Sequence, residues 1–409
     1  MCILSLGPIY WFKITYILLK IFFNKKEKAE IKCSDREINK LLSELSKAEE
    51  TVYIFTYSFF DKDGKNYFFG GGERYAVDLS KIIESFGYKP IIIQCGNEKD
   101  NKPWVREHCG IKILGVNISP MYFSNFVSKI RKSKLKIYSG VANWEINPDD
   151  KSILISHGIC WDNPHVEPDI FILKNILSKT DSIISVDTNT ISWFRSTFPT
   201  FINKYKFELQ YIPNYVDLEK YYPVNKKHSN TVKIVYPRRC SEERGFWLIA
   251  NCIPELLNEF SNIYFECVGF AHTKAIEKKI NKIKELFPER FNHIVCSADE
   301  MDKIYKDADI SIIPTLFSEG TSLSCIEAMA CGNSVISTNI GGLPNLIINN
   351  YNGLLINPNE KELLESIKLL VKNPELRNKL SENAIKVSKE FSKKQWDDRW
   401  KHVLTKYLI

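Results

Sequence analysis

Two glutamates and a group of small polar residues lie close together in the stretch DISIIPTLFSEGTSLSCIEAMACGNSVISTNIGG (309–342). The pattern predicts a strand, a loop, a helix that begins among small polar residues, a Cys-Gly stop and a second strand. Glu319 precedes the helix and Glu327 lies within it, and about six residues at about 1.5 Å of rise each would place the two glutamates roughly 9 Å apart. Carboxylates at this separation can bind hydroxyl groups at two ends of one ligand.

The start of this predicted helix favours an anion between the two glutamates. The first backbone N–H groups of a helix have no partner within it, and the helix dipole attracts negative charge. Thr321, Ser322 and Ser324 supply these amides and hydroxyl groups, and Gly320 allows close approach of the backbone. Either glutamate taken alone would more often be an ordinary cap or part of a solvated helix face, so the argument depends on the whole pattern.

The complete segment resembles the family 4 retaining glycosyltransferases of the GT-B fold, also called glycosyl transferases group 1. The similarity rests on the two glutamates, on Ala-Met-Ala-Cys-Gly after the second, on Gly-Gly-Leu-Pro at 341–344 and on YNGLLINP at 351–358. Asn345 departs from the family, which commonly has Glu there. The resemblance implies that a sugar is transferred from a nucleotide-diphosphate donor.

The resemblance also implies a role for each residue of the segment. Glu319 would contact the hydroxyls of the donor sugar, Glu327 would bind the ribose hydroxyls, and the amides of residues 320–324 would hold the diphosphate. Gly269, which ends the predicted strand IYFECVG (263–269), is assigned to the donor site as well.

A basic turn follows the first strand of the second half of the chain and reads RRCSEERG (238–245). The family has Gly-Arg here and Lys-Gly five residues further on, so Arg239 and Arg244 take the places of its two cations. The departures are Arg244 for the usual Lys and Arg238 for Gly. Two cations at the end of a strand can neutralise a diphosphate leaving group as its charge develops. Without the rest of the pattern, such a turn is more often simply solvated.

Two features of the first half are candidates for the same cleft. The glycine loop FGGGER (69–74) precedes a predicted helix, and the family has a Gly-Gly loop there, so Gly71 and Gly72 are assigned to close contact with the donor. His157 ends the predicted strand KSILISHG, and the resemblance implies that it contacts the transferred sugar or the acceptor. A lone histidine is often structural, and His165 is the less favoured substitute.

The elements that hold these residues form two series of strands that alternate with amphipathic stretches. The predicted strands of the first series are 51–59, 89–95, 111–116, 151–158, 181–187 and 207–216. Those of the second are 232–237, 263–269, 292–298, 309–314, 334–338 and 353–357. Apolar strands separated by helices indicate parallel sheets with helices on both faces. We therefore expect an α/β protein with two doubly wound, Rossmann-like domains that face each other across a cleft.

The expected organisation has five parts. These are an apolar and basic N-terminal extension (1–45), an acceptor-side domain (46–215), a linker (216–231), a nucleotide-sugar-binding domain (232–390) and a terminal helix (391–409). The terminal helix places Phe391, Trp396, Trp400 and Leu404 on one face. That face is suited to crossing back onto the first domain, so its aromatic residues are expected to pack rather than to bind a ligand.

Composition limits the class of protein and its partners. A chain of 409 residues with 44% hydrophobic residues and a net charge of +7 is typical of a soluble enzyme with two or three domains. The positive charge is too weak to indicate nucleic-acid binding. Eleven cysteines without a Cys-x-x-Cys pair predict reduced thiols in the cytoplasm.

Two segments leave contact with a membrane open. The apolar stretch at residues 1–23 fits a helix lying in the plane of a bilayer, or equally a helix packed on the protein. The basic and aromatic segment 120–138 fits an anionic membrane surface, or an ordinary solvated face. The predicted location is therefore cytoplasmic, with the inner face of the cell membrane as a peripheral site.

No cofactor or essential metal is predicted. The Asp-x-Asp triplets at 61–63 and 307–309 lack the surrounding pattern of metal-dependent glycosyltransferases. No side chain is an obvious nucleophile, so we expect same-face attack with retention. The predicted acceptor is a glycan or a lipid-linked molecule in cell-surface polysaccharide synthesis. A nucleotide-sugar epimerase, a phosphorylase of the same fold and a non-catalytic scaffold remain alternatives.

Overall fold

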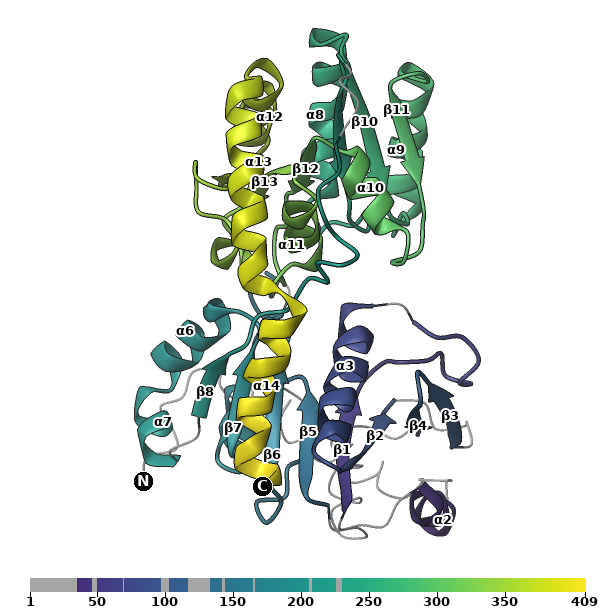
Figure 1. Ribbon diagram of the computed structural model, residues 1–409, viewed down its shortest axis with the longest axis vertical. Helices are drawn as coiled ribbons and strands as arrows, with labels where there is room; N and C mark the ends of the chain where they lie inside the picture. Colours follow the sequence, from purple (N-terminus) through teal and green to yellow (C-terminus); the bar gives the residue numbers. More distant parts are fainter. Residues whose placement is uncertain are drawn as a thin grey trace, which may run out of the picture.

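The computed structural model describes residues 35–45, 50–68, 70–96, 103–116, 133–141, 144–164, 166–205, 208–225 and 230–409. Its described part forms two domains that lie one above the other along the long axis of the molecule (Figure 1). Each domain is a sheet with helices packed on its faces, as expected for strands that are apolar on both sides.

The first domain contains an eight-stranded sheet in the order β3-β4-β2-β1-β5-β6-β7-β8. Its strands are β1 (Thr51–Thr56), β2 (Lys89–Gln94), β3 (Trp104–His108), β4 (Ile111–Gly115), β5 (Leu135–Ser139), β6 (Ser152–Ser156), β7 (Ser182–Ser185) and β8 (Glu208–Tyr211). Its helices are α2 (Asp35–Leu45), α3 (Gly71–Ser85), α5 (Ile170–Leu177), α6 (Thr188–Thr197) and α7 (Pro199–Tyr205). Neighbouring strands are parallel except for the edge pair β3 and β4. The strand order reverses between β1 and β5.

The second domain contains a six-stranded parallel sheet in the order β11-β10-β9-β12-β13-β14. Its strands are β9 (Val232–Tyr236), β10 (Ile263–Val268), β11 (Phe291–Ile294), β12 (Ile310–Ile313), β13 (Ser334–Thr338) and β14 (Leu354–Ile356). Its helices are α8 (Phe246–Glu259), α9 (Lys274–Leu286), α10 (Met301–Asp307), α11 (Leu323–Ala330), η2 (Leu343–Asn345), α12 (Glu360–Lys372), α13 (Pro374–Ser388) and η3 (Lys389–Phe391). The order reverses between β9 and β12, and ligands of doubly wound sheets bind at such switch points.

The last helix, α14 (Lys393–Leu408), leaves the second domain and runs along the first (Figure 1). Its apolar face is buried in the same core as residues of β1, β6 and α3. Trp400 donates a hydrogen bond from its indole nitrogen to the Tyr75 hydroxyl of α3 at 2.8 Å. Val216 forms a β-bridge with Ser392. The chain therefore passes between the domains twice at neighbouring points.

The predicted fold class is confirmed, because both series of predicted strands form parallel sheets in separate domains. Two strands of the first domain, β3 and β5, are additional to the prediction. The prediction missed β5, with the sequence LKIYS (135–139), because Lys136 interrupts its apolar run.

Part of the basic segment 120–138 is a buried strand, which corrects its prediction as a surface. The Lys136 side chain in β5 is fully buried and forms an ion pair of 2.6 Å with Asp150. Burial lowers the pKa of Lys136, while Asp150 favours its charged form. Such a lysine cannot contact a membrane. Residues 117–132, and residues 1–34 of the N-terminal extension, lie outside the described residues.

Candidate active site

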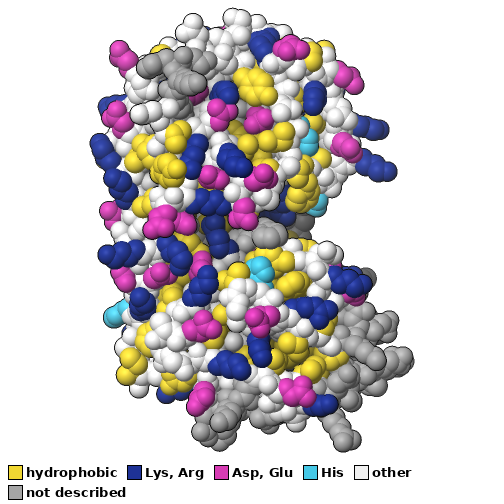
Figure 2. All heavy atoms as spheres, turned by 45° about the vertical axis from the view of Figure 1, so that its right-hand side comes forward, with side chains coloured by type: hydrophobic (Ala, Val, Ile, Leu, Met, Phe, Trp, Pro, Cys, Tyr) yellow, Lys and Arg dark blue, Asp and Glu magenta, His cyan; other side chains and the backbone are white. Residues whose placement is uncertain are grey.

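The surface is hollowed between the two domains, and basic side chains lie at this hollow (Figure 2). Two cavities that share several wall residues occupy it. Cavity A, of about 620 Å³, has walls that include Glu73, His157, Arg244 and Glu319. Cavity B, of about 780 Å³, has walls that include Arg74, Gly269, Cys296 and Glu327. Both lie at the carboxyl ends of strands, where the switch points of the two sheets face each other.

Glu319 is the centre of a buried charge cluster in cavity A. Its Oε2 accepts hydrogen bonds from Arg238 Nη2 at 2.7 Å, Arg244 Nη1 at 2.8 Å and Thr315 Oγ1 at 2.9 Å. Burial would raise the pKa of Glu319, but the two guanidinium groups outweigh it and hold this pKa below its ordinary value. The site therefore combines one carboxylate with two arginines, and it carries a net positive charge that can receive an anion.

The adjacent arginines Arg238 and Arg239, called the arginine doublet below, have different surroundings. The Arg238 side chain is 8% exposed and also donates to Ser322 Oγ at 2.9 Å. The Arg239 side chain, predicted to be one of the two catalytic cations, is 53% exposed and lies 4.0 Å from Glu243. Arg239 is part of the walls of both cavities. The structure thus brings Arg238 and Arg244 to Glu319, and it leaves Arg239 at the rim.

The predicted anion site at the start of α11 lies against the wall of cavity A. Gly320, Thr321, Ser322, Leu323 and Ser324 all line it. Thr321 Oγ1 donates to the carbonyl of Val186 in the first domain, and Ser324 Oγ donates to the carbonyl of Pro237 at 3.2 Å. These hydroxyls are therefore engaged by the protein. Backbone N–H groups of the first turn of α11 remain the groups that can bind an anion here.

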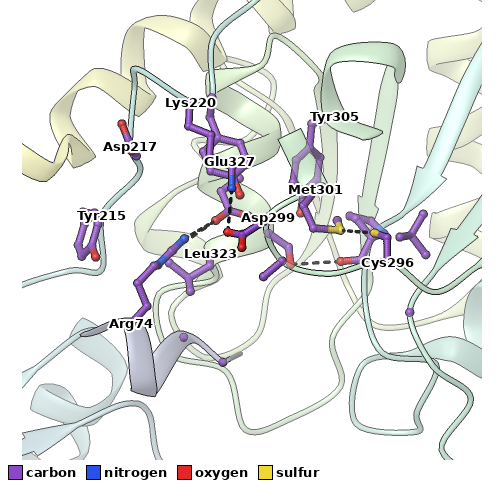
Figure 3. Close-up of a pocket in the computed structure, with 18 of the residues that line it drawn as sticks. Arg74, Tyr215, Asp217, Lys220, Cys296, Asp299, Met301, Tyr305, Leu323 and Glu327 are labelled. Carbon is purple, nitrogen blue, oxygen red and sulfur yellow. Dashed lines mark hydrogen bonds and ion pairs between the residues drawn. The ribbon is translucent and has the colours of Figure 1, made fainter. Parts of the chain in front are cut away.

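Glu327 projects from α11 into cavity B, where an arginine of the first domain meets it. Arg74 Nη1 and Nη2 lie 3.2 and 3.3 Å from Glu327 Oε1. Figure 3 shows Arg74 pointing from α3 toward this carboxylate, with Lys220 close by. Burial raises the pKa of Glu327, and the charges of Arg74 and Lys220 offset this only in part. The ion pair between Arg74 and Glu327 was not predicted from the sequence, although Arg74 lies only two residues after Gly72 of the glycine loop.

His157 lies at the end of β6 on the wall of cavity A. Its Nε2 is 3.0 Å from Ser139 Oγ, at the end of β5, and the edge of the Tyr75 ring packs against the imidazole. Burial lowers the pKa of His157 to about 4. The imidazole is therefore neutral near pH 7 and can exchange hydrogen bonds with a hydroxyl group. His165, the substitute candidate, lies outside the described residues.

Among the predicted site glycines, Gly71 and Gly269 allow close approach of a side chain or of the backbone. Gly71 and Gly72 form the first turn of α3, and a Cβ on Gly71 would lie 2.7 Å from Leu323 Cδ1 across the cleft. Gly72 has open space at its Cβ position. Gly269 has a φ of +147°, and a Cβ there would lie 2.4 Å from the Arg238 carbonyl oxygen. Gly269 therefore lets the end of β10 pack against the arginine doublet.

Glu73, which was not predicted as a site residue, is a second buried carboxylate on cavity A. Its Oε1 accepts a hydrogen bond from Ser58 Oγ at 2.8 Å, and burial raises its pKa. It is also the third residue of α3, a position from which glutamate commonly caps its own helix. The only sequence signal was its place directly after the glycine loop.

The two Asp-x-Asp triplets have structural partners. Asp61 accepts hydrogen bonds from the Lys65 backbone and from Asn66, while Asp309 accepts one from the Lys233 backbone. In the part of the chain that the structure describes, no three metal-ligating side chains gather at one point. Independence from metals remains a prediction, because only an activity measurement can test it.

The fold and the cleft define a two-domain α/β protein with a cationic, carboxylate-bearing site between its sheets. Residues 218–387 match the family described as glycosyl transferases group 1. The family prediction made from the sequence is thereby confirmed.

Two curated relatives and one solved structure give the range of similarity. An uncharacterised glycosyltransferase of Methanocaldococcus jannaschii is 40% identical over 97 residues, which is 24% of this chain and 27% of that protein. One of Haemophilus influenzae is 22% identical over 347 residues, which is 82% of this chain and 96% of that protein. Sucrose-phosphate synthase of Thermosynechococcus elongatus matches with a TM-score of 0.68 and 15% identity, over 87% of this chain and 98% of that one. The structural match confirms the GT-B fold.

Proposed function

We propose that the protein is a retaining glycosyltransferase that moves a sugar from a nucleotide-diphosphate donor to a hydroxyl group of a glycan or lipid-linked acceptor. The observation that carries the proposal is the Arg238–Arg244–Glu319 cluster beside the first turn of α11. A buried pair of guanidinium groups next to unpaired helix amides is suited to a diphosphate, whose charge grows as it leaves.

The donor would extend through both cavities. Its diphosphate would lie at the boundary that Arg238 and Ser324 share, and its nucleoside would lie in cavity B, where Glu327 can accept hydrogen bonds from ribose hydroxyls. Its sugar would lie in cavity A, between Glu319 and His157. Because Arg74 already contacts Glu327, donor binding would have to displace or share this ion pair.

In the proposed reaction the bond between the anomeric carbon and the diphosphate oxygen breaks, and a bond to the acceptor oxygen forms on the same face. The acceptor proton passes to the departing diphosphate. The two arginines stabilise the negative charge that this diphosphate gains. Glu319 Oε2 is held by three donors and is therefore poorly placed to act as a nucleophile.

A panel of UDP-, GDP- and ADP-sugars tests the proposal, with donor hydrolysis and thermal stabilisation as readouts. Slow hydrolysis of one donor and faster release of its nucleotide on addition of a glycan acceptor are expected. Product NMR should show the donor's anomeric configuration, and activity should survive EDTA. Phosphorolysis or epimerisation of the donor, an inverted product, or loss of activity on chelation with recovery by Mn²⁺ would each contradict a part of the proposal.

The location at a membrane is a separate part of the proposal. Among the described residues there is no helix of the length and apolarity needed to span a bilayer. We infer peripheral contact of residues 1–34 with anionic lipid from their sequence. Flotation with phosphatidylglycerol vesicles, using the full chain and a form lacking residues 1–24, tests this, and equal recovery of both forms would contradict it.

A further inference from the structure

The loop after β6 in the first domain reaches the loop before α11 in the second. Both carboxylate oxygens of Asp162 lie 3.0 Å from the backbone nitrogen of Ser318, and the Ser318 hydroxyl donates to Oδ1 at 3.4 Å. One domain thus provides a charged acceptor for a backbone N–H of the other. Hydrogen bonds to a charged group are stronger than those between neutral groups.

Ser318 has an unusual backbone conformation that needs such support. Its φ is +57°, in the left-handed region that residues other than glycine rarely adopt. Such conformations persist where the surroundings hold them, and they are frequent at functional sites. Asp162 therefore contacts a residue whose backbone would otherwise favour a conformation with negative φ.

The carbonyl group of Ser318 leads directly to the charge cluster. Arg244 Nη1 donates to this carbonyl at 3.0 Å and to Glu319 Oε2 at 2.8 Å. A change in the Ser318 backbone would therefore move one of the two acceptors that orient Arg244. A single residue, Ser318, therefore links Asp162 to Arg244.

The same two loops are in backbone contact next to this point. A Cβ on Gly158 would lie 2.8 Å from the Gly320 nitrogen, and one on Gly320 would lie 2.4 Å from the His157 carbonyl oxygen. Asp162 can reach Ser318 because the domains lie this close together. The contact between Asp162 and Ser318 thus depends on this close approach of the two domains.

We propose that Asp162 is a positioning residue that couples the contact between the two domains to the placement of Arg244. It holds Ser318 in its left-handed conformation, and the Ser318 carbonyl then orients the Arg244 guanidinium toward Glu319 and the leaving diphosphate. The role given to Arg244 rests on the proposed function, whereas the action of Asp162 on Ser318 does not. Asp162 itself touches no reacting atom.

The first test requires no donor. Backbone hydrogen exchange of residues 315–321 is compared in the full-length wild type, Asp162→Ala and Asp149→Ala. Asp149 is a matched control because it is an exposed aspartate in a turn of the same domain. We expect about tenfold faster exchange at Ser318 in Asp162→Ala and wild-type exchange in the control. Unchanged exchange at Ser318 would overturn the proposal, whatever the activity.

The second test separates positioning from general destabilisation. With UDP-, GDP- and ADP-glucose as probes, Asp162→Ala should lower kcat about 10- to 100-fold, as expected for a misplaced transition-state group, and leave the donor KM within about threefold. Asp162→Asn keeps one acceptor oxygen, so its kcat should lie between that of the wild type and that of Asp162→Ala. Adding Ser318→Gly to Asp162→Ala should recover about threefold or more, because glycine adopts a positive φ without steric cost.

Failure of the coupling and failure of the proposed function give different results. Wild-type turnover of Asp162→Ala, or a defect that Ser318→Gly does not relieve, would overturn the coupling while the glycosyltransferase proposal stands. A wild-type chain that turns over none of these probes nor any donor of the wider panel would remove the proposed function, and the role of Arg244 with it. Exchange at Ser318 would still decide whether Asp162 holds that backbone.

Discussion

Single residues of the cleft show how a buried carboxylate can serve a site that is positive overall. Glu319 is almost fully buried, yet it faces two guanidinium groups and a hydroxyl at hydrogen-bonding distance. Because the arginines stabilise its ionised form, the cluster stays charged in an environment that would otherwise favour the neutral acid. Removal of one member leaves the others buried without compensation.

Replacement of Glu319 tests the cluster. In Glu319→Gln the volume is kept, but both arginines lose their anion, so sugar transfer should fall on the order of 100-fold. Glu243→Gln is the control, because this nearby carboxylate pairs at 4.0 Å with the exposed Arg239 and should stay within about threefold of wild type. Initial rates with the donor found in the panel give the comparison, and equal rates for the two variants would remove Glu319 from the site.

The arginine doublet gives a second prediction at this scale. Arg238 is buried against Glu319 and Ser322, whereas the Arg239 side chain is about half exposed. Arg238→Ala should therefore reduce transfer at least about tenfold more than Arg239→Ala, because a desolvated cation acts more strongly than one in water. Steady-state rates of both variants decide this. A larger defect in Arg239→Ala would restore the assignment made from the sequence.

At the scale of elements, the site is built from strand ends that two sheets direct toward one another. His157 directly follows β6, Ser139 ends β5, and α3 begins with the glycine loop, so three elements of the first domain meet at cavity A. Tyr75 of α3 covers the imidazole and helps keep it away from water. The packing of these elements, rather than a nearby charge, sets the protonation state of His157.

This packing predicts how stability depends on pH. The pKa of His157 is about 4 in the folded chain and 6.5 for an ordinary histidine, so between these values the unfolded chain binds the proton more readily. Stability should therefore fall as the pH is lowered from 6.5 to 4. His157→Gln should show a shallower decline of Tm over this window, while His402→Gln, on the exposed side of α14, should follow the wild type. Parallel Tm curves for all three proteins would contradict this explanation.

For the whole molecule, the two domains are joined by more than their linker. α14 contributes Trp396, Trp400, Val403, Leu404 and Leu408 to the core of the first domain, although it follows the second in the chain. Arg74 with Glu327 and Asp162 with Ser318 connect the facing edges of the cleft. The cleft is therefore closed by groups that also belong to the proposed site, so ligand binding and domain arrangement should influence each other.

Truncation of Trp400 tests the role of α14. Trp400→Ala removes a fully buried indole and its hydrogen bond to Tyr75, so the free energy of unfolding should fall by about 3–5 kcal/mol. His402→Ala, two residues away and exposed, should change it by less than about 0.5 kcal/mol. Urea unfolding followed by circular dichroism measures both. A loss below about 1 kcal/mol in Trp400→Ala would show that the helix is not essential to the first domain.

The amino-acid sequence alone determined the features that depend on local patterns. Apolar runs and amphipathic stretches indicated two parallel-sheet domains, and the segment around Glu319 and Glu327 indicated the family and predicted an anion site. Strand β5 was missed because Lys136 breaks its apolar pattern, and only the distant Asp150 explains how that lysine can be buried.

Only the tertiary structure decided which side chains meet. Arg238 and Arg239 are neighbours with the same chemistry, and the path of the chain after β9 turns one toward Glu319 and the other toward solvent. Arg74 and Glu327 are 253 residues apart, and Asp162 and Ser318 are 156 apart. No local sequence pattern indicates these pairs, because they form only when the two domains pack across the cleft.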